Sequence, residues 1–239
     1  MVADLAVLRK DNAVPQSTLL SRAEVLSHYR HLREISKRHH SAVLKFLSGD
    51  AIMSQAQRLG LSRGKTLVLD SVDDLNLAFD LAIHTAPKDR SRAIDRYARA
   101  ARLPAGSDES LVLEAMRHAR FSIIRLVRLH DVVGLIVKDL FRGVECWLVD
   151  EGLESSLSIG AVLATRLFAP ESYAMTAGVM VPIHKELIED AIADTPQLIR
   201  KGYEEMIDDR HFAEAIYRTA FSSGVMEQVR YQDPSAEAG

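Results

Sequence analysis

The sequence predicts an α+β protein in which helical regions flank a small antiparallel β-barrel or sheet. Between residues 121 and 183, β-branched and apolar segments alternate with Gly, Pro and Asp, a pattern typical of short strands joined by turns. Residues 21–119 and 184–230 instead repeat apolar residues every three or four positions, the period of an amphipathic helix. We therefore expect a helical N-terminal half, about five strands within 121–183, and a helical C-terminal region packed on the rest.

Length and composition are those of an ordinary globular protein. The chain has 239 residues, of which 47% are hydrophobic and 26% charged, so it can bury a large core without covalent help. Its single cysteine, Cys146, allows no internal disulfide, and the start of the chain lacks the pattern of a secretory signal. No apolar run approaches the length of a membrane span, and no motif indicates a cofactor. We expect a cytoplasmic protein.

The first helix is expected to begin at Ser21, after a mobile tail over residues 1–20. Ser21 and Glu24 have the spacing of a capping box, in which each satisfies a backbone amide near the helix start. His39 falls within the apolar stripe and is interpreted as a partly buried, hydrogen-bonded histidine rather than a metal ligand, while Gly49 is expected to end the helix. The apolar residues that share its buried face are Val25, Tyr29, Leu32, Ile35, Val43 and Phe46.

Residues 50–119 are expected to contain a short strand near 66–69 and three further helices. Ser71 and Ser107 are candidates to start the first and third of these helices, with residues 90–102 forming the second. Residues 56–62 resemble the turn of a helix-turn-helix, which leaves a DNA-binding regulator open as an alternative function. Gly64 and the strand that follows disfavour a recognition helix there.

The β region divides at its turn residues. Several of the segments are almost continuously apolar, so both of their faces need cover, which favours a closed or half-closed barrel packed against helices. The predicted strands are residues 121–129, 133–138, 144–149, 160–168 and 173–181.

Four segments of this region resemble an uncharacterised family of bacterial proteins. They are VKDLFRGVE over residues 137–145, LVDEGL over 148–153, GxVLATRL over 160–167 and MTxG over 175–178. The similarity reaches back to Tyr29 and Gly60 and spans about two thirds of the chain. The family has no known activity, so the resemblance implies a single evolutionary unit and assigns no functional residue.

Charge is unevenly divided along the chain. Residues 1–65 carry a formal charge of +6 and the remainder −9, within a total of −3. Arg30, Arg33, Lys37 and His40 recur at helical spacing and form a basic flank beside the apolar stripe. Three interpretations stay open: a solvated face with a few ion pairs, contact with the acidic part of the same molecule, and contact with an acidic protein or nucleic acid.

Two other groups of residues are weak candidates for chemistry. Asp139, Glu145 and Arg166 lie in the β region and contain the carboxylate and guanidinium groups that acid/base chemistry uses, although turn and ion-pair roles explain them as well. Arg166, in a predicted apolar strand, needs a carboxylate partner. A metal site is weakly indicated by Glu204, Asp208 and His211, which would share one face of a continuous helix.

The favoured function is that of a non-catalytic binding protein that contacts an acidic macromolecular partner through the basic N-terminal helix. This hypothesis fails if Arg30 and Lys37 are locked against acidic neighbours in the same molecule. An enzyme with a carboxylate and arginine site between barrel and helices is the alternative. A homo-oligomer formed through the helix over residues 21–48 is a third option.

Overall fold

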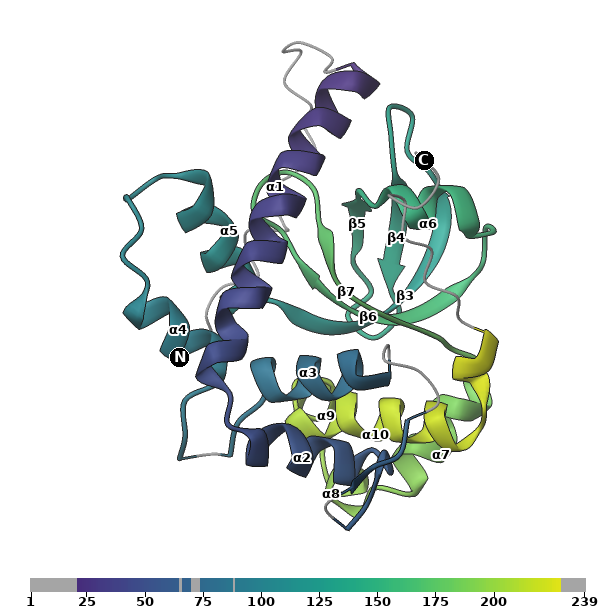
Figure 1. Cartoon of the computed structure of the whole chain (residues 1–239). Helices are drawn as coiled ribbons and strands as arrows, with labels where there is room; N and C mark the ends of the chain where they lie inside the picture. Colours follow the sequence, from purple (N-terminus) through teal and green to yellow (C-terminus); the bar gives the residue numbers. More distant parts are fainter. Residues whose placement is uncertain (1–20, 65, 70–73, 88, 229–239) are drawn as a thin grey trace.

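The computed structural model describes residues 21–64, 66–69, 74–87 and 89–228. It consists of a five-stranded antiparallel sheet surrounded by helices (Figure 1). The α+β class is therefore confirmed. The predicted tail over residues 1–20 and the predicted cap Ser71 lie outside the described residues. No helix in the described ranges combines the length and apolar character needed to cross a bilayer.

All five predicted strands are present and follow the order β5-β4-β3-β6-β7 in the sheet. Gly and Asp mark their ends as expected, because the turns need these residues. The sheet is not closed into a barrel, since its two edge strands share only an isolated parallel bridge between Leu148 and Ala174. The strands are β3 (Arg120–Leu129), β4 (Leu135–Asp139), β5 (Glu145–Leu148), β6 (Val162–Phe168) and β7 (Met175–Pro182).

The pairing of β6 with β7 is irregular at Arg166. Thr165 pairs with Met180 and Leu167 with Thr176, so one residue of β6 lies opposite three residues of β7. Gly178, in the middle of those three, has a φ of 100°, a conformation that glycine adopts without strain. A bulge of this kind bends the strand and changes the direction of nearby side chains.

Helix α1 (Arg22–Val43) begins as predicted. Ser21 accepts a hydrogen bond from the amide of Glu24, and the Glu24 side chain accepts one from Ser21, which completes the capping box. Its apolar face is buried in the protein's own core, and the chain then continues as the short 3₁₀ segment η2 (Leu44–Phe46). The expectation that Gly49 ends this helix is wrong: Gly49 begins α2 (Gly49–Arg58), because Ser48 caps that helix.

The chain after α2 forms the hairpin β1 (Ser62–Arg63) and β2 (Thr66–Leu67), so no recognition helix follows the candidate helix-turn-helix turn. The second predicted helix starts at Ala93 rather than at residue 90, and Ser107 caps the third as expected. Helix α6, between β5 and β6, was not predicted. The remaining helices are α3 (Asp74–His84), α4 (Ala93–Ala100), α5 (Asp108–Arg117), α6 (Glu151–Ser156), α7 (Lys185–Ala193), α8 (Pro196–Ile199), α9 (Tyr203–Ile207), α10 (Arg210–Ser222) and η3 (Val225–Gln228).

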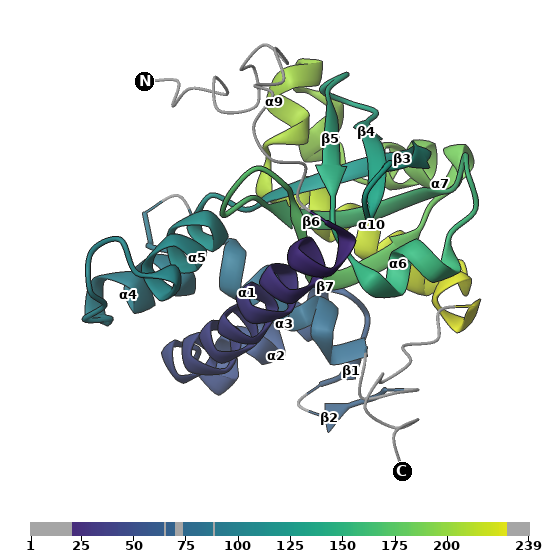
Figure 2. The ribbon, with the colours of Figure 1, turned by 90° about the horizontal axis from the view of Figure 1, so that it is seen from above.

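Three hydrophobic clusters join the helices to the sheet. One face of the sheet, with Phe121 and Ile123, packs against α2, α3 and α7 to α10, which form the lower layer in Figure 1. The opposite face, with Ile124 and Leu126, is closed by α6 through Leu153. Helices α1, α4 and α5 form a third cluster at the side of the sheet, with α4 and α5 projecting from the body (Figure 2).

Candidate functional site

Arginines in the first half of α1 form ion pairs with α6. Arg22 forms an ion pair with Glu154 at 2.7 Å, and Arg30 forms one with Glu151 at 2.6 Å. Both contacts join residues more than 100 positions apart in the chain, so the sequence pattern of α1 alone did not predict them. The acidic part of the same molecule therefore neutralises this half of the basic flank.

Arg33 is held more tightly than Arg22 or Arg30. Its guanidinium donates hydrogen bonds to the backbone oxygen of Thr176, to the Thr176 hydroxyl at 3.1 Å and to Asp150 at 3.3 Å. The side chains of Arg33 and Asp150 are only 20% and 6% exposed. Asp150 also accepts the Thr176 hydroxyl at 2.7 Å and caps α6 through the amide of Leu153. Arg33 is thus a structural residue that joins α1 to α6 and β7.

His40 is not a surface cation. Burial lowers its pKa to about 4, assisted by the nearby Arg33 charge, so the imidazole is neutral at physiological pH. Its Nδ1 lies 3.1 Å from the Ser36 carbonyl oxygen. The prediction for His39 is confirmed: it is buried, with Nδ1 2.8 Å from the Tyr97 hydroxyl and Nε2 2.9 Å from the Glu109 carbonyl oxygen.

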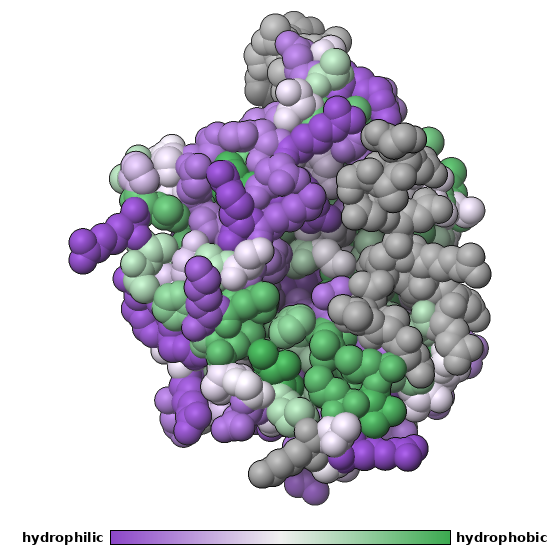
Figure 3. Space-filling view, viewed as in Figure 1, coloured by the Kyte–Doolittle hydropathy of each residue, from purple (hydrophilic) through white to green (hydrophobic). Residues whose placement is uncertain are grey.

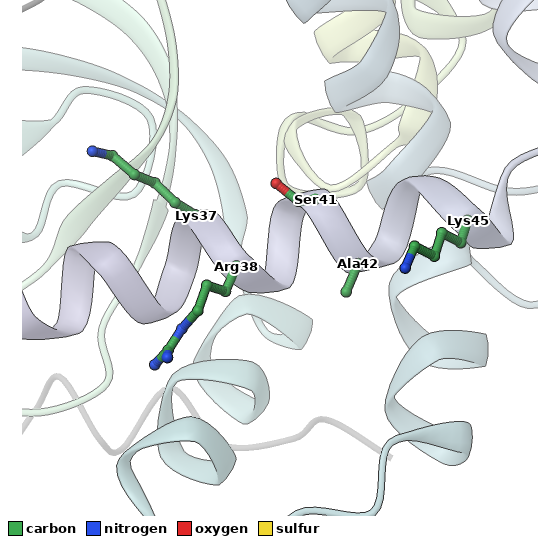
Figure 4. A pocket seen from close by; sticks show the side chains of 5 residues that line it. All are labelled: Lys37, Arg38, Ser41, Ala42 and Lys45. Atoms are coloured by element: carbon green, nitrogen blue, oxygen red, sulfur yellow. The ribbon is translucent and has the colours of Figure 1, made fainter.

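The second half of α1 faces solvent and carries a shallow hollow. Arg38 and Ala42 occupy positions i and i+4 of α1, and Lys45 follows on η2, so all three lie on one side of this continuous helical segment (Figure 4). Because Ala42 is small, space of about 340 Å³ remains beside the two long cationic side chains, with Lys37 and Ser41 at its border. Figure 4 shows Ala42 between Arg38 and Lys45, and Lys37 extending from another side of the helix.

The cations at this hollow are weakly held within the molecule. Lys37 pairs with Glu34 at 2.7 Å, but both side chains are about two-thirds exposed, at 65% and 66%. Arg38 reaches Glu109 only at 3.5 Å and is also 65% exposed. Lys45 has no ion pair with any residue in the described ranges. Exposed pairs of this kind contribute about 0 to 1 kcal/mol each, so a partner can replace them readily.

The weak catalytic candidates are not brought together. Asp139 is a turn residue: its Oδ1 accepts hydrogen bonds from the amides of Phe141 and Arg142 at 2.9 Å, and its Oδ2 pairs with the Arg142 side chain. Arg142 bonds in turn to Asp208. Glu145 is exposed on the edge strand β5, opposite Lys138 in the sheet register. Arg166 lies in a different ion pair, so these three residues form no common site.

Arg166 has the carboxylate partner that its strand position requires. Its guanidinium contacts both oxygens of Asp80 on α3, at 2.8 and 2.9 Å, and the Tyr217 hydroxyl donates to the same carboxylate at 3.1 Å. Burial alone raises the pKa of Asp80, but the charge and hydrogen bonds of Arg166 outweigh it and lower that pKa. The fully bonded pair is charged and structural, and it joins α3, β6 and α10.

Three further residues with reactive side chains are Asp80 and His84, which are buried, and Cys146, which is half-buried. Asp80 and His84 share α3, but Asp80 is occupied by Arg166, and burial holds the pKa of His84 well below its usual value. None of the described residues offers the His84 ring nitrogens a hydrogen bond. Burial also raises the pKa of Cys146 to about 11, so its thiol stays protonated and is a poor nucleophile at neutral pH.

The predicted metal face at Glu204, Asp208 and His211 rests on a helix that does not exist. The chain breaks between α9 and α10, because Asp209 caps α10 by accepting a hydrogen bond from the amide of His211. Asp208 is paired with Arg142 instead. Across the part of the chain that the structure describes, no three His, Cys, Asp or Glu side chains are grouped to hold a metal ion.

Sequence reasoning missed Arg38 and Lys45, which the structure places at the hollow. Their signal was present as two cations at i and i+7 with a small residue between them. The surface over α1 is largely hydrophilic, whereas hydrophobic side chains gather lower on the same face, over the region of α2 and α3 (Figure 3). At the end of α1, Lys37, Arg38 and Lys45 are exposed beside the partly exposed Leu44.

Comparison with known proteins gives one match. The sequence profile of a protein family described as "Family of unknown function (DUF7986)" matches residues 23–228, which include every residue discussed above except Ser21 and Arg22. No curated protein and no solved structure matches the chain.

Proposed function

We propose, for a chain that belongs to the DUF7986 family of unknown function, that it is a non-catalytic binding protein for an acidic macromolecule. The contact is the exposed basic surface at the end of α1, formed by Lys37, Arg38 and Lys45. The observation that carries the proposal is the hollow of about 340 Å³ bordered by these three cations, none of which is buried or strongly paired.

The proposal moves the contact along the helix from where the sequence pattern placed it. Arg30 and Arg33 are engaged with α6, and His40 is neutral, so of the four predicted contact residues Lys37 alone keeps an available charge. Lys37 has a carboxylate neighbour, Glu34, which is itself exposed and one turn away on the same helix. Such a pair is weak in water, so the neighbour reduces the local charge without locking Lys37 in place.

Less support exists for the alternative functions. A catalytic role for Asp139, Glu145 and Arg166 lacks an assembled site, since Asp139 and Arg166 serve separate ion pairs. An oligomer formed through α1 lacks an apolar seam, because Val25, Leu32 and Ile35 of its stripe are buried in the protein's own core. As part of the proposal we take the protein to be cytoplasmic, in keeping with its single free cysteine.

The test measures binding of the whole chain to three labelled probes at low salt: a 20-base-pair DNA duplex, a single-stranded RNA and poly-glutamate. We expect at least one probe to bind, with an affinity that falls steeply as salt is added. The triple variant Lys37→Glu, Arg38→Glu, Lys45→Glu should bind more than about 10-fold more weakly.

A matched control makes the same change in net charge on other surfaces. Arg125, Lys138 and Arg200 are exposed and form no ion pair with another described residue, so their triple change to Glu should leave probe binding nearly unaltered. Thermal unfolding of both variants checks that they fold. Absence of binding to every probe, or equal weakening by both triple variants, would refute the proposal.

A further inference from the structure

A second basic surface lies on α4, beside the end of α1. Residues 90–102 contain five arginines and a single acidic residue, Asp95. Asp95 is already engaged by Arg92 and Arg117, so it does not neutralise the outer face of the helix. Arg96 and Arg99 on α4, and Arg102 two residues beyond its end, recur every three residues, and all three are exposed.

These arginines have no carboxylate partner within the described residues. Arg99 and Arg102 form neither an ion pair nor a side-chain hydrogen bond there, and Arg96 bonds only to backbone oxygens. α4 therefore resembles the second half of α1 in presenting available cations. It differs from α7, where four acidic residues and one lysine occur between positions 185 and 194.

Arg96 connects the two basic surfaces. Its guanidinium donates a hydrogen bond of 2.6 Å to the carbonyl oxygen of Phe46, the residue that follows Lys45. The α4 arginines thus begin directly beside the hollow at Arg38 and Lys45, and Arg99 lies about 4.5 Å further along the axis of α4. Together, Lys37, Arg38, Lys45, Arg96, Arg99 and Arg102 form what we call the α1–α4 basic surface.

The chemistry of this surface favours phosphates over an acidic protein. Protein interfaces have an apolar centre rich in aromatic residues, whereas phosphate contacts require only cations and other donors. On the α1–α4 basic surface, Tyr97 is turned inward to His39, and the apolar side chain with notable exposure is Leu44, at 38%. With no exposed aromatic residue between its cations, the surface also offers no platform for stacking unpaired bases.

We infer that the α1–α4 basic surface binds the phosphate backbone of a nucleic-acid duplex, without reading its sequence. This inference rests on the proposed function and specifies its partner. A duplex presents a dense and continuous row of negative charges, which matches a row of cations that crosses from one helix to the next. The planar guanidiniums of Arg99 and Arg102, which no described residue engages, can each hold a phosphate through two hydrogen bonds.

The number of cations sets the expected dependence on salt. Each phosphate contact to duplex DNA lowers the slope of log K against log salt by about 0.9, so six contacts give a slope of about −5. Neutralising two contacts should reduce the steepness by about 2. It should also weaken binding by roughly 10- to 100-fold at about 0.1 M salt.

The experiment measures the affinity of the whole chain for a 20-base-pair DNA duplex between about 0.05 and 0.3 M salt, and compares it with single-stranded DNA and poly-glutamate. The test variant is Arg99→Gln, Arg102→Gln, which removes two positive charges, keeps polar side chains and breaks no ion pair or side-chain hydrogen bond of the described residues. The control is Arg125→Gln, Arg200→Gln, which removes the same charge elsewhere. Duplexes of two unrelated sequences should bind equally.

Each outcome decides between the two proposals. Duplex binding with a steep slope, weakened by the α4 variant and not by the control, supports the inference. Binding of poly-glutamate without binding of the duplex, or preference for single strands, overturns it while leaving the proposed function intact. Duplex binding that both double variants reduce equally removes α4 from the contact. Failure of every probe to bind overturns the proposed function as well.

Discussion

The two halves of α1 carry similar basic residues but have different neighbours. In the first half, Arg22, Arg30 and Arg33 meet three carboxylates at the start of α6 and bond to them. In the second half, Arg38 is exposed and reaches Glu109 at 3.5 Å, and Lys45, on η2 directly after α1, forms no ion pair with a described residue. One half of the helix therefore stabilises the fold, and the other is available to a partner.

A basic stripe on a helix therefore does not by itself indicate whether its cations stabilise the fold or are available to a partner. Spacing placed Arg30, Arg33, Lys37 and His40 on one flank, and the structure divides that flank into paired, neutral and exposed members. What separates them is whether the tertiary fold supplies a carboxylate or a dry environment. Substitutions in each half of α1 test whether its cations contribute to stability or to binding.

The largest effect is expected at Arg33. Arg33→Met keeps much of the aliphatic stem but removes the charge that pairs with the buried Asp150, so Asp150 is left uncompensated. We expect the free energy of unfolding to fall by about 3 to 5 kcal/mol, measured by urea denaturation. Removing both charges, in Arg33→Met with Asp150→Asn, should recover part of this loss. A loss below about 1 kcal/mol would show that the first half of α1 is no more structural than the second.

A pH effect should arise at the boundary between the halves, at His40. Burial lowers its pKa to about 4 from the usual 6.5, so between these values the unfolded chain binds a proton that the folded chain does not. Stability should therefore fall as the pH falls through this window, by at most about 3 kcal/mol from His40. His84, whose pKa burial also lowers, contributes in the same direction.

The variant His40→Gln isolates this contribution. It retains a donor for the Ser36 carbonyl but cannot take up a proton in this range. Urea denaturation at several pH values from 7 to 4 should give a shallower decline in stability than that of the unmodified chain. An unchanged decline would mean that His40 is accessible to solvent in the folded protein.

A smaller effect is expected at Arg30, whose pair is structural in position but exposed. Its side chain is 64% exposed and that of Glu151 is 39% exposed, so water competes with the contact. We expect Arg30→Ala to lower the free energy of unfolding by about 0.2 to 1 kcal/mol, with less effect at high salt. A loss comparable to that of the Arg33 variant would mean that the two pairs act as a unit.

The smallest effect on stability is expected in the second half. Lys45→Ala removes an exposed cation without an ion pair in the described residues, so unfolding should change by less than about 0.5 kcal/mol. Binding to the duplex probe should nevertheless weaken about 5- to 10-fold, because one phosphate contact is lost. If stability fell and binding did not, the assignment of the two halves would have to be reversed.

Local signals in the sequence predicted much of the fold. The Ser21 and Glu24 capping box, the five strands with their turn residues, and the need of Arg166 for a carboxylate all depend on short-range chemistry or on a burial rule. The sequence did not indicate that Ser48 would cap a new helix at Gly49, or that Asp209 would divide the C-terminal helix. In both cases a single capping hydrogen bond set the start of a helix, although the periodicity of the surrounding sequence indicated a different boundary.

The candidate site was less predictable because it depends on which segments meet in space. When the net charge of residues 1–65 is compared with that of the remaining residues, the arginines of α4 are counted in the acidic part of the chain. In the structure, α4 packs beside the end of α1. The partners of Arg30 and Arg33 lie more than 110 positions away. No periodicity within one helix carries this information.

The bridge between Leu148 and Ala174 also limits how other molecules can approach the sheet. An open strand edge can recruit a strand from another chain, which leads to aggregation or to peptide capture. Here the chain at the end of β5 is hydrogen-bonded to the chain at the start of β7. The amide of Val149 donates to the carbonyl oxygen of Ala174, and the amide of Ala174 donates to that of Trp147, so the backbone groups of the two edges pair with each other at this end. Addition of a strand from another chain is therefore disfavoured at this end of the sheet.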